Sequence, residues 1–233
     1  MNTKKIRDAG GTVAGLDAGL EVRGLSKTYG TVRVLEDLNL RVPLGGSQAI
    51  LGPTGRGKTT LLRCIAGLET PDGGMIRINE QWVFHEGLAL PPAERGIAMA
   101  FQQPCLWPHM TVAANVAFAV SHLSKSGRMD RTAWALDLLG LAALADRHPA
   151  ELSGGQARRV SLARALAPRA PLLLLDESLV NLDPESRKTA QDAINKVRSA
   201  DPFTLLLVTH DTTEAQVLCD RTCTLGELLT PQD

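Results

Sequence analysis

The 233-residue sequence predicts an α/β fold built around a parallel sheet. Two continuous apolar runs, residues 171–175 and 204–208, are bounded by breaking residues, as expected for strands buried on both faces of such a sheet. A third apolar run, Ser47–Leu51, leads into a glycine-rich turn, and a helical stretch follows over residues 58–67. Strands and helices therefore alternate around a buried sheet.

The remaining elements follow from local patterns. Residues 20–25, 38–42 and 75–79 alternate apolar and polar side chains, which predicts half-buried strands. The segment from about 104 to 167 is mostly helical by composition, with apolar residues at helical spacing, and predicts a helical insert. Residues 1–19 are rich in Gly, Ala and Thr without periodicity, and we expect a flexible N-terminal extension there.

Composition excludes several function classes. The 25 Lys and Arg balance the 25 Asp and Glu, which argues against a general binder of nucleic acid or anionic membranes. Four Phe, three Trp and one Tyr are too few for a base-stacking sheet. The four cysteines lack a zinc-site spacing, and no apolar run is long enough to span a bilayer. We expect a soluble cytoplasmic protein with free thiols.

A phosphate-binding loop is predicted by Gly52-Pro-Thr-Gly-Arg-Gly-Lys-Thr59, which matches GxxxxGK[ST] between a predicted strand and a predicted helix. Its glycines let backbone N–H groups converge on a phosphate chain, and the helix N-terminus adds positive potential. Lys58 supplies a cation for the β- and γ-phosphate oxygens, and the Thr59 hydroxyl is a candidate Mg²⁺ ligand. The candidate ATP-binding residues here are Gly52, Pro53, Thr54, Gly55, Arg56, Gly57, Lys58, Thr59 and Thr60.

Two acids follow the buried strand at 172–175, where a partner for the phosphate loop is needed. Asp176 is a candidate Mg²⁺ ligand, and Glu177 is placed to orient or deprotonate an attacking water. Together with the phosphate loop, these acids predict binding and hydrolysis of a nucleoside triphosphate.

A second helix N-terminus has the features of an anion site. Ser153 resembles an N-cap before a helix over 157–166, and Gly154, Gly155 and Gln156 follow it. This site has no lysine or strand-end acid of its own. We therefore expect it to complete the nucleotide site of a second copy arranged head to tail.

The whole set resembles the ATP-binding subunit of ABC transporters, over nearly the whole chain from residue 20 to 229. The matching motifs, in chain order, are Tyr29, residues 52–59, Gln102, residues 152–156, residues 172–183 and His210. The resemblance implies a P-loop NTPase core of ABC type, with an antiparallel β subdomain near residues 20–50 and 75–84 and a helical subdomain at about 104–167. It implies one ATP-binding domain over 20–233, and no C-terminal regulatory domain because the sequence ends at Asp233.

The resemblance also assigns roles. Tyr29 is expected to stack on adenine, the alternative being a core tyrosine at a strand end. Gln102 is expected to contact Mg²⁺ and the attacking water, with Gln103 beside it as a loop residue. His210 is expected at the γ-phosphate, and Asp183 at the dimer seam. The other histidines receive no role: His85, His109, His122 and His148.

The sequence departs from the family pattern at a few positions. Arg56 stands where a small residue is usual, and Ser178 and Val180 differ from the usual residues after the catalytic glutamate. Ala157 and Arg158 differ from the usual pair after the signature and are expected to face out from their helix.

Residues 91–95, 101–102, 106–112 and 115–118 are similar to importer ATPases. The resemblance implies ATP and Mg²⁺ as cofactors, a homodimer of the ATPase, transmembrane permease subunits and a solute-binding protein, with no nucleic acid. It places the chain at the inner face of the cell membrane. The alternatives are an ABC exporter ATPase, and a soluble ABC-type ATPase of DNA repair or translation.

Overall fold

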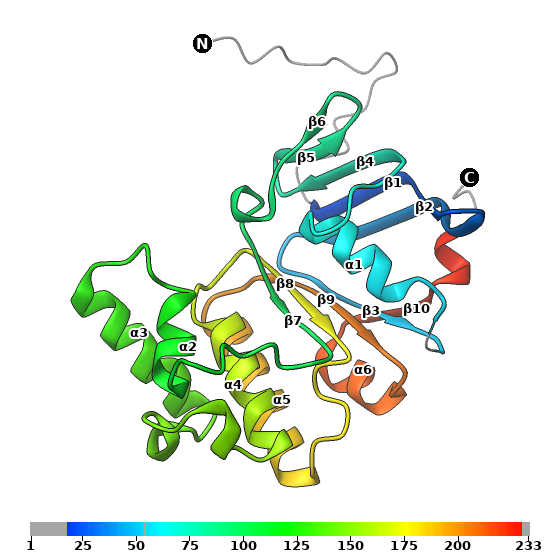
Figure 1. Ribbon diagram of the computed structural model, residues 1–233. Helices are drawn as coiled ribbons and strands as arrows, with labels where there is room; N and C mark the ends of the chain where they lie inside the picture. The colour runs from blue at the N-terminus through cyan, green and yellow to red at the C-terminus, as the bar shows by residue number, and fades with distance from the viewer. Residues whose placement is uncertain (1–17, 54, 230–233) are drawn as a thin grey trace.

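The computed structural model describes residues 18–53 and 55–229, which form two sheets and a group of helices (Figure 1). The first sheet is antiparallel, with the strand order β2-β1-β4-β5-β6. Its strands are β1 (Ala18–Tyr29), β2 (Val32–Pro43), β4 (Gly73–Ile78), β5 (Gln81–His85) and β6 (Leu88–Ala89). The predicted antiparallel subdomain is thus present, although its first segment ends at Pro43 and not near residue 50.

The second sheet is parallel, with the strand order β10-β3-β9-β8-β7. Its strands are β3 (Ser47–Leu51), β7 (Ile97–Ala100), β8 (Leu172–Asp176), β9 (Thr204–Thr209) and β10 (Arg221–Thr224). The prediction that the two continuous apolar runs form strands buried on both faces of a parallel sheet is confirmed by β8 and β9, which also pair with each other.

Alternate side chains of β8 and β9 enter two different hydrophobic cores. One core lies between the parallel sheet, α1 (Lys58–Ala66) and the antiparallel sheet, and it takes Leu172, Leu174, Leu206 and Val208. The other lies between the parallel sheet and the remaining helices, and it takes Leu173, Leu175, Leu205 and Leu207. Because both faces are covered, these strands have no polar face, and this explains their unbroken apolar sequence.

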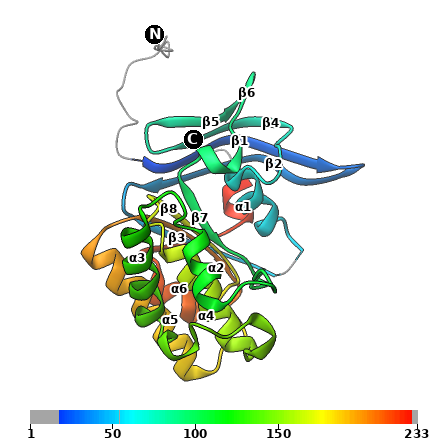
Figure 2. The ribbon, with the colours of Figure 1, turned by 60° about the vertical axis from the view of Figure 1, so that its left-hand side comes forward.

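The helices other than α1 lie on the far side of the parallel sheet from the antiparallel sheet, as the two views of the ribbon show (Figures 1 and 2). They are α2 (Val112–Phe118), α3 (Lys125–Leu138), α4 (Gly154–Leu166), α5 (Pro184–Ala200) and α6 (Thr212–Leu218). Short 3₁₀ turns cover Pro92–Glu94, Ala142–Leu144, Pro149–Glu151 and Gly226–Leu229. The predicted helical insert is therefore present as α2, α3 and α4.

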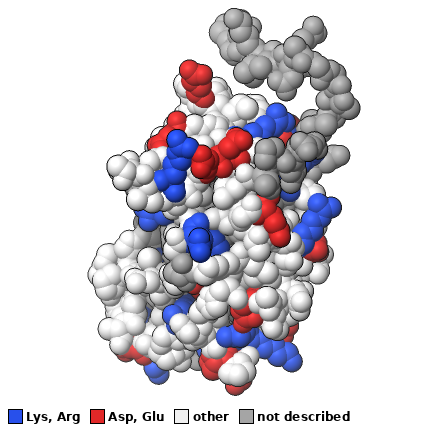
Figure 3. All heavy atoms as spheres, turned by 90° about the vertical axis from the view of Figure 1, so that its right-hand side faces the viewer, with Lys and Arg blue, Asp and Glu red and all other residues white. Residues whose placement is uncertain are grey.

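None of the described helices has the length and apolarity needed to cross a bilayer. On the face drawn in Figure 3, side chains of both charge signs are interspersed among uncharged ones. This mixture agrees with the formal net charge of zero.

The first strand begins two residues inside the predicted N-terminal extension. Residues 1–17 of that extension lie outside the described residues, but Ala18 and Gly19 belong to β1, and Ala18 is buried. Gly19 packs so closely on β9 that a Cβ atom added to it would lie 1.9 Å from Thr204 Oγ1. The absence of a side chain thus lets the strand start here, although glycine gave no strand signal in the sequence.

We expect Gly19→Ala to lower the free energy of unfolding by about 1–3 kcal/mol, because the new methyl group overpacks against the buried Thr204. Urea unfolding of the purified chain measures this change. The matched control is Gly73→Ala, where a new Cβ meets nothing within 4 Å. Equal stability of the two variants would contradict the proposed packing.

Candidate active site

The phosphate loop connects β3 to α1, and its backbone requires glycine. Gly57 precedes the first residue of α1 with φ +96°, and an added Cβ would lie 2.9 Å from both the Val34 carbonyl oxygen and a Val34 methyl group. Gly55 has φ +83°. Because Gly57 has no side chain to cap α1, the first N–H groups of this helix have no side-chain acceptor there and suit an anionic ligand. Thr54 of this loop lies outside the described residues.

Lys58 is buried beneath the loop, with 4 % of its surface exposed. Its ammonium donates hydrogen bonds to the carbonyl oxygens of Gly52 (2.7 Å) and Pro53 (2.9 Å). It also lies 3.6 Å from Glu177 Oε1. An ammonium has three protons, so two loop carbonyls fix Lys58 while one donor remains for a further acceptor.

Asp176 ends β8 beside the first turn of α1. Thr59 donates a hydrogen bond from Oγ1 to Asp176 Oδ1 at 3.0 Å. Burial raises the pKa of the Asp176 carboxyl, and the neighbouring Glu177 raises it further, while the Thr59 hydrogen bond and Lys58 oppose this. The site therefore disfavours the ionised carboxylate and favours a compensating cation.

The donor set suits Mg²⁺, which prefers oxygen ligands and keeps several waters. A hydroxyl (Thr59) and a carboxylate (Asp176) adjoin here, and the Gln102 side chain lies within reach of Glu177 beside them. Within residues 18–53 and 55–229, no group of three His, Cys, Asp or Glu side chains could hold a metal without other ligands. Water or substrate oxygens must therefore complete the coordination of a cation at this position.

Glu177 lies at the centre of the site. Its backbone has φ +46°, its N–H donates to the Val208 carbonyl oxygen at 2.8 Å, and the residue is 6 % exposed. Gln102 donates from Nε2 to Glu177 Oε2 at 3.2 Å. His210 places Nδ1 at 3.6 Å from the same oxygen. The strand ends of β7, β8 and β9 thus bring Gln102, Glu177 and His210 together, as the sequence predicted.

Tyr29 ends β1 near α1. It is 44 % exposed, so the alternative of a core tyrosine is wrong, although stacking on adenine stays a prediction. The Lys27 ammonium lies 5.2 Å from the centre of the ring. Partial burial and the nearby Glu69 carboxylate raise the pKa of the Tyr29 hydroxyl.

The predicted signature residues cap α4 at the surface. Ser153 Oγ accepts from the Gln156 N–H (3.2 Å), and Gln156 Oε1 accepts from the Ser153 N–H (2.9 Å), which makes a capping box. A Cβ on Gly155 would lie 3.6 Å from Asp183 Oδ2. Asp183 in turn caps α5 by accepting from the Ser186 N–H at 3.0 Å, and this bond lowers the pKa of the Asp183 carboxyl.

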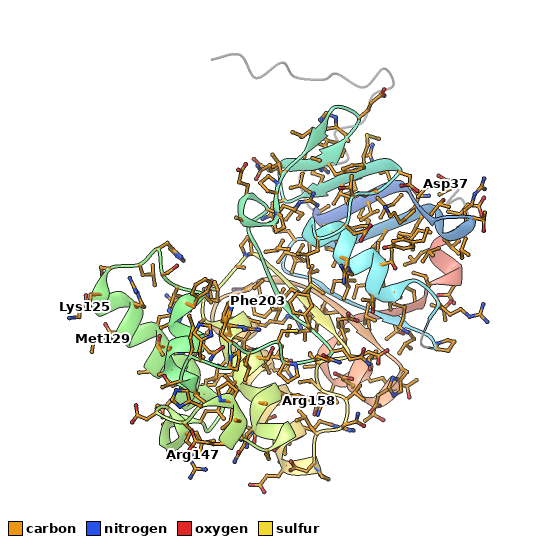
Figure 4. All side chains as sticks on the ribbon, in the orientation of Figure 1. Asp37, Lys125, Met129, Arg147, Arg158 and Phe203 are labelled. Atoms are coloured by element: carbon orange, nitrogen blue, oxygen red, sulfur yellow. The ribbon has the colours of Figure 1, made fainter. Side chains whose placement is uncertain are left out.

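The departures from the family pattern have different surroundings. Arg56 is exposed and lines a cavity of about 560 Å³ between the start of β2 and the residues that follow β10, whereas Lys58 is not among its lining residues. Ser178 is buried, and its hydroxyl has no hydrogen-bond partner among the described residues. Ala157 and Arg158 are half-buried, so neither is fully exposed, and their outward direction stays a prediction. Figure 4 labels Arg158 on α4.

Sequence reasoning missed two arginines that stabilise the helix and the loop next to the site. Arg95 is 3 % exposed and donates to the carbonyl oxygens of Cys64 and Ile65 in the last turn of α1. Arg164 of α4 donates to the carbonyl oxygens of Pro104 and Cys105, and so fixes the loop that follows Gln102. A single sequence contains no signal for such long-range bonds to carbonyl groups.

Comparison with known proteins gives consistent matches. The family model described as ABC transporter matches residues 35–180. The chain is 43 % identical over 203 residues to the Fe(3+) ions import ATP-binding protein FbpC of Pseudomonas fluorescens, covering 87 % of this chain and 57 % of the relative. It is 40 % identical over 214 residues to the sulfate/thiosulfate import ATP-binding protein CysA of Escherichia coli K12, covering 89 % and 58 %. The chain thus spans less than two thirds of the length of these relatives.

Solved structures agree with the fold. A dimeric ATP-binding cassette in a post-hydrolysis state, bound to ADP and Pi, has a TM-score of 0.79 and 29 % identity, and the match covers 88 % of this chain and 93 % of that one. The cbiO1 component of the cbiONQ ABC transporter complex of Clostridium perfringens has a TM-score of 0.77 and 27 % identity, covering 89 % and 84 %.

We expect Asp176→Asn to raise the free energy of unfolding of the ligand-free chain at pH 7. The pKa of Asp176 is raised in the folded state, so wild-type stability falls as the pH rises through that value, and a neutral amide avoids this loss. The advantage of the variant shrinks as the pH falls toward the ordinary carboxyl value of 3.8. Urea unfolding between pH 5 and 8 measures it, with the exposed Asp130→Asn as a control of equal charge change. A less stable Asp176→Asn at pH 7 would refute the argument.

Proposed function

The chain belongs to the ABC transporter family, and from this premise we propose that it binds ATP with Mg²⁺ and hydrolyses it to power a membrane permease. The observation that carries the proposal is the meeting of the phosphate loop with two strand-end acids. Thr59 contacts Asp176 at 3.0 Å, and Lys58 lies 3.6 Å from Glu177. The phosphate loop with Lys58 suits a phosphate chain, whereas the two acids suit a cation and a water.

Each site residue has a separate task in this proposal. Lys58 and the N–H groups at the start of α1 bind the β- and γ-phosphates, and Tyr29 stacks on the base. Thr59, Asp176 and Gln102 would hold Mg²⁺, which supplies charge neutralisation on the phosphate oxygens.

The catalytic residues act on the attacking water. Glu177 orients it or takes its proton, since its carboxylate is buried and contacted by Gln102 and His210. His210 contacts the γ-phosphate. Because the Glu177 carboxylate shares its oxygens among these neighbours, the protein's own side chains fix its direction.

A second copy of the chain completes each site. The exposed N-terminus of α4 offers backbone N–H groups next to the Ser153 hydroxyl, and Asp183 lies beside it on α5. The sequence around this end of α4, residues 149–158, contains no lysine and does not follow a strand-end acid, so we infer that Ser153, Gly154, Gly155 and Gln156 bind the nucleotide of the partner. One of the structural neighbours is itself a dimer bound to ADP and Pi, which supports this arrangement.

The permease would dock on the helical part. An apolar groove of about 610 Å³ lies between α2 and α3, and its lining includes Ala113, Ala117, Met129, Thr132 and Trp134. Met129 is 63 % exposed and lies with Lys125 on the outer side of α3 (Figure 4). A groove of this kind suits a short amphipathic helix of a membrane protein.

We infer an importer of a small solute or ion, because the similar curated proteins are import ATP-binding proteins for ferric iron, sulfate and maltose. Such a system would include a solute-binding protein, and the chain would lie at the cytoplasmic face of the membrane. Uptake assays in a deletion strain test the direction: loss of export with normal uptake would favour the exporter alternative.

Replacing Glu177 by Gln tests the catalytic assignment. We expect the rate of ATP hydrolysis to fall by about 10²-fold or more, because the amide does not accept the proton of water, while ATP binding is retained. Phosphate release and equilibrium binding of a fluorescent ATP analogue measure the two effects. Glu80→Gln, in the exposed turn between β4 and β5, is the matched control. Hydrolysis at the wild-type rate in Glu177→Gln would refute the assignment.

Replacing Ala117 by Glu tests the docking groove. A carboxylate in the apolar groove is expected to abolish co-sedimentation of the chain with membranes that contain its permease, while hydrolysis by the isolated chain stays normal. Ala200→Glu, at the exposed end of α5, carries the same change elsewhere. Equal co-sedimentation of the two variants would place the permease contact on another surface.

A further inference from the structure

The position of the His210 side chain depends mainly on its backbone. It follows β9 directly, its side chain is 51 % exposed, and Nδ1 lies 3.6 Å from Glu177 Oε2. A half-exposed imidazole has little packing around it, so its direction depends on the conformation of residues 209–211. The groups that fix these residues therefore bear on the reaction, although they do not touch the substrate.

A buried hydroxyl links Thr209 and Asp211, the two residues that flank His210, by a hydrogen bond. Thr209 is fully buried, and its Oγ1 accepts a hydrogen bond from the Asp211 N–H at 3.1 Å. The same Oγ1 donates to Glu214 Oε2 at 2.6 Å, which is a short charge-assisted type of contact. Asp211 Oδ1 then accepts from the N–H groups of Thr213 and Glu214, so the start of α6 is joined to the same network.

Burial of the Glu214 carboxyl at this position costs free energy. It is 2 % exposed, and its Oε1 is buried without a hydrogen-bond partner among the described residues. Burial and the nearby Asp211 raise the pKa of the Glu214 carboxyl, while the Thr209 hydrogen bond, Arg187 and His210 oppose this. A buried carboxyl with one satisfied oxygen destabilises the fold relative to an apolar residue, so its presence calls for a compensating role.

We propose that Thr209 and Glu214 are positioning residues that hold the backbone of His210 so that its imidazole faces Glu177 and the γ-phosphate. The inference rests on the proposed function for its catalytic meaning. Glu214 orients the Thr209 hydroxyl by accepting a hydrogen bond from it, so that a lone pair of the hydroxyl oxygen faces the Asp211 N–H and accepts from it.

The kinetic test compares two substitutions of Thr209, of which the first keeps the side-chain volume and the second keeps the hydroxyl. Thr209→Val removes the hydroxyl and both of its hydrogen bonds. We expect kcat for ATP to fall about tenfold with little change in KM, because the Asp211 N–H beside His210 loses its acceptor, a loss on the scale of one buried hydrogen bond. Thr209→Ser keeps the hydroxyl and is expected to restore kcat. In a His210→Ala background, Thr209→Val is expected to cause no further loss, because it acts through His210. A further loss in that background would overturn the proposal.

A second measurement does not depend on activity. The ¹³C-labelled histidine signals of the ligand-free chain are compared, and the His210 signal is identified by its absence in His210→Ala. We expect Thr209→Val and Glu214→Leu to move this signal, while Glu214→Gln, which keeps an acceptor oxygen, moves it less. The remaining histidine signals are expected to stay in place, and these belong to His85, His109, His122 and His148.

The outcomes separate the two hypotheses. An unmoved His210 signal in Thr209→Val refutes the positioning role, whatever the wild-type chain hydrolyses. Movement of all five histidine signals together would indicate a general change of fold and would also refute it. Absence of ATP hydrolysis by the wild-type chain, with the His210 signal moved as expected, would refute the proposed function and leave the positioning role in place.

Discussion

Burial of β8 and β9 on both faces is the constraint on which the rest of the structure depends. Their leucines alternate between two cores, so neither strand is free to rotate or to slip by one residue without exposing a set of apolar side chains. Since parallel strands end at the same edge of a sheet, Asp176, Glu177 and His210 are fixed next to one another at this edge. The polar chemistry of the site is thus positioned by strands that are themselves almost entirely apolar.

The same arrangement brings two buried carboxyl groups together, which costs electrostatic free energy. Asp176 and Glu177 are adjacent buried carboxyl groups, and the nearest cation, Lys58, is also bonded to two loop carbonyl groups. The raised pKa of Asp176 is a sign of this cost. A cation and a phosphate chain bound here would offset this cost, which favours ligand binding at the site.

Much of the fold and of the candidate site was predictable from the sequence, because the sequence patterns that indicate them are local. The phosphate loop, the apolar strands and the acids after β8 each occupy a few consecutive residues with a recognisable spacing. The bonds made by Arg95 and Arg164 join residues far apart in sequence, and no periodicity reports them. Likewise, no apolar periodicity reports the start of α3 at Lys125, since its first turns are polar and only the Ser124 cap marks it.

The helix α5 connects the surface around Gly155 and Asp183, which is expected to meet a second copy, to residues 209–211. Asp183 caps this helix beside Gly155, and one turn later Arg187 is ion-paired with Asp211 at 3.1 Å. Both side chains of this pair are about one third exposed, so the pair alone contributes little. The connection instead depends on the helix, whose buried face packs into the core beneath β8 and β9. The proposed contact of a partner at Asp183 would therefore act on a helix that also contacts Asp211 beside His210, so the proposed assembly and the proposed catalysis depend on the same helix.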